Sequence, residues 1–140
     1  MRLALLMAVL AGVAVAFQVN LTSAAQRNLG TLLVVAFSGL TTATVAFGVS
    51  LFASKPELTE RAVIYAVASG VFGAIILGGV TYAAGQAGVA RALSLVIASQ
   101  LLVGLVLDAL GAFGTEADFS LPKALGVLLI LAGGILVVRY

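Results

Sequence analysis

The chain has 140 residues, of which 63% are hydrophobic and only 9% are charged. A soluble domain carries about 25% charged residues, so this composition is typical of an integral membrane protein. The sequence contains neither cysteine nor histidine, which removes disulfides, thiolate and imidazole chemistry and most transition-metal sites. Seven basic residues against five acidic ones give a net charge of +2 without a basic cluster, so nucleic acid is not an expected partner.

Five apolar stretches are each long enough to cross a bilayer as a helix, which takes about 20 mainly apolar residues. They cover residues 3–24, 31–53, 62–82, 90–108 and 122–139. Polar or glycine-rich segments separate them, namely "QRNLG" (26–30), "SKPELTER" (54–61), "AAGQAGVAR" (83–91) and "GTEADFSLPK" (114–123). The first of these segments supplies a helix-ending glycine, Gly30, and the last offers Ser120 as an N-cap with Pro122 in the first turn of the final helix. We therefore predict an all-α, multi-pass membrane protein in which residues 1–140 form a single five-helix transmembrane domain.

The first span admits a second interpretation, because its apolar run followed by "TSAAQ" resembles a signal peptide with Ser23 and Ala25 placed for cleavage. We favour a retained transmembrane helix, since the apolar run continues to residue 24.

Small residues recur at every fourth position down the first and third spans. Such residues let helix backbones approach closely in a membrane, so we expect them to pack within one bundle, with a dimer seam as the alternative. The residues assigned this packing role are Gly12, Ala16, Gly70, Ala74 and Gly78.

The fourth span carries two polar residues within "IASQLLVGLVLDALGAFG" (97–114). Gln100 and Asp108 share one helix face, and their spacing puts Gln100 about 12 Å deeper than Asp108. A carboxylate is tolerated at the end of a span, whereas Gln100 at mid-depth needs a partner, for which Gln18 and Asn20 are candidates. Two interpretations stay open: Gln100 joins helices and Asp108 ends one, or both line a transport cavity.

Catalytic chemistry has little support in the sequence. The acidic residues all lie at span ends or in loops, and they are Glu57, Glu60, Asp108, Glu116 and Asp118. No nucleophile–base pair or metal cluster can be assembled from this residue set. We therefore expect no enzyme activity, no catalytic residue, no metal and no cofactor.

A family resemblance rests mainly on residues 99–114, "SQLLVGLVLDALGAFG", followed by "SLPKALGVLLILAGGILV" (120–137). These segments resemble the C-terminal part of the YdcZ-like families of half-size proteins in the drug/metabolite transporter superfamily. "LAGVAVAFQ" (10–18) and "GVFGAIIL" (70–77) are similar to the family's glycine-rich first and third spans. Where the family usually has asparagine four residues after the first-span glutamine, this chain has Thr22.

The resemblance implies a secondary transporter subunit for a small metabolite or amphipathic compound in the bacterial inner membrane. It further implies a ten-helix antiparallel assembly working by alternating access, formed by a homodimer or with a paired homologue of opposite orientation. The candidate substrate-binding residues are Gln18, Asn20, Ser99 and Gln100, with Asp108 as a possible coupling residue. The alternative function is a non-transporting membrane scaffold or accessory subunit.

The loop charges predict weak control over membrane orientation. One side would carry four basic residues, Arg2, Lys55, Arg61 and Lys123, and the other three, Arg27, Arg91 and Arg139. This bias barely specifies orientation under the positive-inside rule, so reporters fused to the C-terminus should be found on both sides of the membrane. Adding about two or three lysines to one set of loops should then select one orientation. A single orientation without a paired homologue would contradict the antiparallel assembly.

Overall fold

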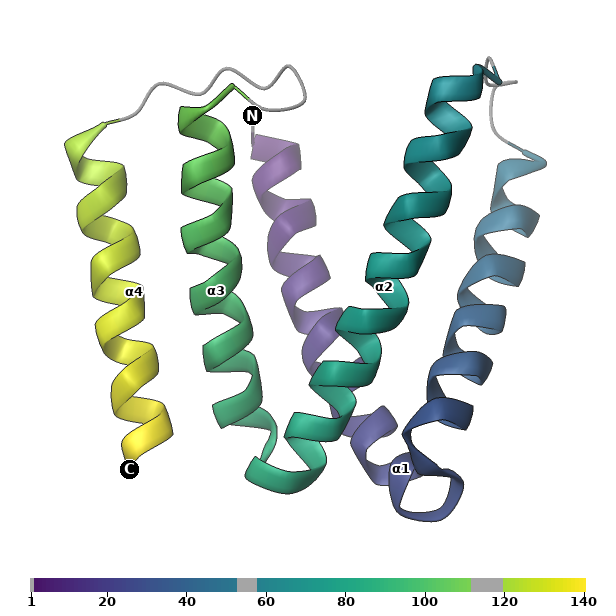
Figure 1. Ribbon diagram of the computed structural model, residues 1–140, viewed down its shortest axis with the longest axis horizontal. Coiled ribbons are helices and arrows are strands. Elements are labelled where there is room, and N and C mark those ends of the chain that lie inside the picture. Colours follow the sequence, from purple (N-terminus) through teal and green to yellow (C-terminus); the bar gives the residue numbers. More distant parts are fainter. Residues whose placement is uncertain (1, 53–57, 112–119) are drawn as a thin grey trace. The chain divides into compact units, whose positions relative to one another are not determined.

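The computed structural model describes residues 2–52, 58–111 and 120–140 of the chain. The regular structure within these ranges is helical and comprises α1 (Arg2–Ser50), α2 (Glu60–Ala87), α3 (Val89–Ala109) and α4 (Leu121–Arg139) (Figure 1). All four helices are long and apolar enough to cross a membrane. The predicted all-α class is thus confirmed for the described part of the chain.

Element α1 contains a break at Gly30. The backbone of this residue is non-helical, with φ 74° and ψ 159°, a conformation that is essentially restricted to glycine. An unbroken helix of 49 residues would measure about 74 Å, against a hydrocarbon core of about 30 Å. The chain turns at Gly30 (Figure 1). The predicted helix-ending role of this glycine is confirmed, whereas residues 26–29, predicted as a loop, are helical.

The boundary between α2 and α3 is built in the same way. Gly88 adopts φ 91° and ψ 151°, and α3 begins at the next residue. The predicted loop at 83–91 was therefore too long, because α2 continues through Ala87 and a single glycine supplies the whole change of backbone conformation.

Polar residues mark the starts of α2 and α4. Thr59 precedes α2, and its Oγ1 accepts a hydrogen bond of 3.3 Å from the backbone N–H of Ala62, as an N-cap residue does. Ser120 is the N-cap residue of α4 and Pro122 lies in the first turn, as predicted from the sequence. The Ser120 hydroxyl itself makes no capping hydrogen bond.

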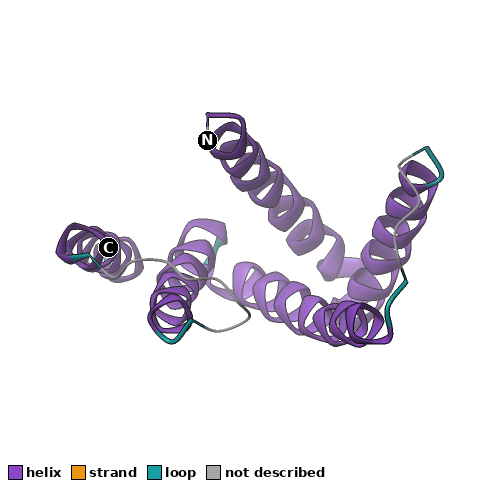
Figure 2. Cartoon of the chain, turned by 90° about the horizontal axis from the view of Figure 1, so that it is seen from above, coloured by secondary structure: helices purple, strands orange, loops and turns teal. Residues whose placement is uncertain are grey.

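The chain divides into two compact units, Met1–Gln86 and Ala87–Tyr140. The buried residues of the first unit lie on both sides of the Gly30 turn and in the last third of α2, and they are Val19, Thr22, Val34, Val80, Thr81 and Ala84. In the second unit α3 packs against α4, and Ala92 is buried. Figure 2 shows that helices make up nearly all of the described chain within both units.

The glycines assigned to helix packing differ in their surroundings. A Cβ on Gly78 would lie 3.6 Å from Val35 Cγ2, so this glycine contacts the second segment of α1. A Cβ on Gly12 or Gly70 would meet no atom within 4 Å. Ala74 is exposed and Ala16 is half-buried. The packing role of all five residues, Gly78 included, thus stays a prediction.

Replacement of Gly30 by alanine should destabilise the protein by about 1–3 kcal/mol, the cost of a side chain in this glycine-only conformation. Crowding does not contribute, because a Cβ at Gly30 would meet nothing within 4 Å. Gly39→Ala is the matched control, since Gly39 is a helical glycine with equally open surroundings. Unfolding of the purified variants in detergent measures the difference. Equal losses of stability in both variants would contradict a glycine-dependent turn at position 30.

Candidate functional site

Two buried threonines connect α1 with α2. Thr81 Oγ1 donates a hydrogen bond of 3.0 Å to Thr22 Oγ1, and Thr22 Oγ1 donates in turn to the Val19 carbonyl at 3.3 Å. Thr81 is 0% exposed and Thr22 is 6% exposed. Each hydroxyl has a single proton, so both donors are used in these two bonds. The oxygen of Thr81 keeps lone pairs that can accept a further hydrogen bond.

Gln26 lies one helical turn after Thr22 and approaches α2. Its side-chain oxygen Oε1 is buried and has no hydrogen-bond partner in the described structure. A Cβ on Gly85 would lie 2.8 Å from this oxygen, closer than side-chain packing allows, so glycine at 85 makes room for the Gln26 amide. We call Thr22, Gln26, Thr81 and Gly85 the polar cluster of the first unit.

Sequence reasoning missed most of this cluster. It placed Gln26 in a loop, noted Thr22 only as a departure from a family pattern, and assigned no role to Thr81 or Gly85. A signal was available for α1, because Gln18, Thr22 and Gln26 recur at every fourth position and therefore share one helix face. No comparable pattern marks Thr81, since its importance arises from the hydroxyl opposite it.

The predicted site residues of the first unit are exposed. Asn20 Nδ2 donates a hydrogen bond of 2.9 Å to the Ala16 carbonyl of its own helix. Gln18 makes no hydrogen bond with another residue in the described ranges. Asn20 is thus partly satisfied by its own backbone, whereas the amide of Gln18 makes no such bond.

In the second segment of α1, which follows Gly30, two threonine hydroxyls form hydrogen bonds with carbonyl groups of their own helix. Thr41 Oγ1 donates to the Phe37 carbonyl at 2.9 Å, and Thr44 Oγ1 donates to the Leu40 carbonyl at 2.8 Å. Such bonds let a hydroxyl sit on an apolar helix without an external partner. For these two residues, the structure indicates a local role.

The predicted site residues of the second unit lie on α3. Ser99 Oγ donates to the Val96 carbonyl at 2.9 Å. Gln100 is exposed and has no hydrogen bond to another described residue. Asp108 is exposed and lies one residue before the end of α3, at the helix terminus that the sequence predicted. Gln18 and Asn20 belong to the other unit, so the predicted pairing of Gln100 with them stays a prediction.

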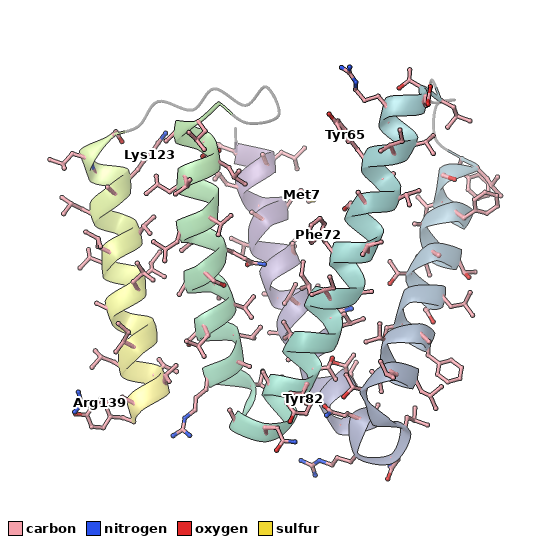
Figure 3. The ribbon with its side chains drawn as sticks, in the orientation of Figure 1. Met7, Tyr65, Phe72, Tyr82, Lys123 and Arg139 are labelled. Carbon is pink, nitrogen blue, oxygen red and sulfur yellow. The ribbon has the colours of Figure 1, made fainter. Side chains whose placement is uncertain are left out.

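The ends of the apolar spans are marked by aromatic and charged side chains. Tyr65 and Tyr82 lie near the two ends of α2 (Figure 3), and their spacing corresponds to about 26 Å along a helix. Tyrosine is enriched at both membrane–water interfaces. Because Thr81 directly precedes Tyr82 and Gly85 lies three residues after it, we expect the polar cluster at the level of one interface.

Acidic groups contribute little to the described site. Glu57, Glu116 and Asp118 lie outside the described residues, as does the basic Lys55. Within the described ranges, no group of three histidine, cysteine, aspartate or glutamate residues could hold a metal ion. The polar groups available within the spans are therefore mainly neutral amides and hydroxyls, which bind by hydrogen bonding.

Comparison with protein families gives a match over nearly the whole chain. A family model described as "Putative inner membrane exporter, YdcZ" matches residues 3–136. No curated protein and no solved structure gave a match. The family match covers all of α1 except its first residue, all of α2 and α3, and most of α4. The chain therefore belongs to the YdcZ family.

Proposed function

We propose that this protein is one half of a secondary transporter that moves a small metabolite or amphipathic compound across the bacterial inner membrane by alternating access. Membership of a family described as inner membrane exporters supports a transport role in general. The observation that carries the more specific proposal is the exposure of Gln18 and Gln100 on otherwise apolar helices, without hydrogen bonds to other described residues.

The break in α1 supports an odd number of membrane crossings. Its segments before and after Gly30 correspond to about 42 Å and about 30 Å of helix, and the hydrocarbon core is about 30 Å thick. In our proposal each segment crosses once, so that α2, α3 and α4 bring the total to five. An odd number places the two ends of the chain on opposite sides of the membrane, as required of halves that assemble in inverted orientation.

A second half explains the exposed amides. Hydrocarbon offers no hydrogen bonds, so an amide facing lipid within a span is costly. A partner of opposite orientation would cover Gln18 and Gln100 and place them around a cavity near the bilayer midplane. The scaffold alternative instead requires each amide to be satisfied inside a closed single-chain bundle.

Gln100→Leu should abolish transport while leaving the assembly of two chains intact, because leucine is readily accommodated in a membrane helix. Flux into liposomes from mixed metabolite pools, with and without a pH gradient, measures activity, and native mass measurement in nanodiscs measures assembly. Val103→Leu is the control, since Val103 is an exposed aliphatic residue of the same helix. Normal flux in Gln100→Leu would place the substrate site elsewhere, and an active single chain would refute the dimer.

Asp108→Asn should have a smaller effect than Gln100→Leu. The substitution keeps the shape of the side chain and one acceptor oxygen but replaces the other oxygen with an NH2 donor and removes the charge. Asp108 also lies in the last turn of α3 rather than at mid-depth. Flux measured across a range of pH values should therefore keep its wild-type profile. Loss of pH dependence in this variant would instead assign proton coupling to Asp108.

A further inference from the structure

We propose that Gln26 forms a binding subsite for a neutral hydrogen-bond donor, such as a hydroxyl group of the transported solute, at the interface level of the first unit. This inference rests on the proposed transport function and names a chemical class of solute. The subsite is distinct from the mid-span residues Gln18 and Gln100, and it is formed by the polar cluster of Thr22, Gln26, Thr81 and Gly85.

The buried hydrogen-bonding groups of the cluster lack a donor, since the only unpartnered buried side-chain atom among the described residues is the Gln26 oxygen. The hydroxyl protons of Thr81 and Thr22 are donated to Thr22 Oγ1 and the Val19 carbonyl. The unused capacity at the cluster's centre is accepting, and it comprises the lone pairs of Thr81 Oγ1 and the buried, unpartnered Gln26 Oε1. A buried acceptor without a partner costs about 1–3 kcal/mol, and a donor brought by a ligand would recover this energy.

The cluster reaches the protein surface through the Gln26 side chain. Gln26 as a whole is half-buried although its oxygen is fully covered, so the side chain extends from the surface into the helix contact. Gly85, beside the Gln26 oxygen, lies one helical turn beyond Thr81, which is about 6 Å along the helix axis. This spacing suits a small polar group better than an extended ligand.

The charge around the cluster favours a neutral donor over a cation. The exposed Arg27 directly follows Gln26, and a like charge brought close to it would be repelled. The described residues within four positions of Gln26 on α1 and of Gly85 on α2 include no acidic side chain that would offset this repulsion. A hydroxyl group can supply the missing proton without adding charge.

Nuclear magnetic resonance of the glutamine side chains tests the proposal without requiring transport. The chain has four glutamines, at positions 18, 26, 86 and 100, so side-chain ¹⁵N labelling gives few signals, which Gln→Leu variants assign. Titration of the full-length protein in nanodiscs with n-butanol should shift the Gln26 amide signals saturably. Diethyl ether, an isomer without a donor, should leave them unshifted, and n-butylammonium should shift them less than n-butanol.

Two glycine variants and the side-chain signal of Gln86 provide a further test and its controls. Gly85→Ala should weaken the apparent n-butanol affinity about two- to tenfold, the value of one hydrogen bond, because its Cβ displaces the Gln26 oxygen. Gly79→Ala, on the same helix with nothing within 4 Å of its Cβ, should bind as the wild type does. The exposed Gln86 reports non-specific partitioning and should not shift.

Several results would overturn the proposal. These are no saturable Gln26 shift, equal shifts with both isomers, equal shifts at Gln86, a stronger response to n-butylammonium, or unchanged affinity in Gly85→Ala. The binding readout is separate from liposome flux. A Gln26 response in a protein that transports nothing would refute the proposed function alone, whereas flux without a Gln26 response would refute the subsite alone.

Discussion

Hydrocarbon supplies no hydrogen bonds, and this constraint shapes the whole chain. Every backbone N–H and C=O within a span must be satisfied by the chain itself, so the apolar stretches form helices from end to end. The same constraint explains why two of the turns are so short. At Gly30 and at Gly88 only one residue leaves the helical conformation, so few backbone groups are left outside a helix near the membrane.

Side chains in this protein meet the same constraint in two ways. Asn20, Thr41 and Thr44 return their donors to carbonyl groups of their own helix, which makes them compatible with an apolar environment. Gln18 and Gln100 have longer side chains and no such bonds. Their amides therefore need a partner outside their own unit, and a second inverted chain and a polar solute both meet that need in the proposed transporter.

The polar cluster contains both satisfied and unsatisfied polar side chains at one contact between two helices. Thr22 and Thr81 satisfy each other, and their mutual hydrogen bond brings α1 and α2 together at the level of Gly85. The Gln26 side chain extends into this contact, where its oxygen has no hydrogen-bond partner. The interaction that stabilises the helix pair thus also leaves an unpartnered acceptor beside it, and we propose that this acceptor binds a solute hydroxyl.

The sequence by itself determined the membrane class, the positions of the apolar spans and the family, because each depends on composition and local pattern. Span length, the helix-ending role of Gly30 and the Gln100–Asp108 spacing can all be evaluated along one segment of chain. Helix boundaries were less accurate at 26–29 and 83–87, because polar residues at the ends of membrane helices stay helical when a following glycine makes the turn. Only the tertiary structure revealed the pairing of Thr22 with Thr81 and the approach of Gly85 to Gln26. These contacts join residues far apart in the chain, and their energies depend on which side chain lies opposite, which no local pattern records.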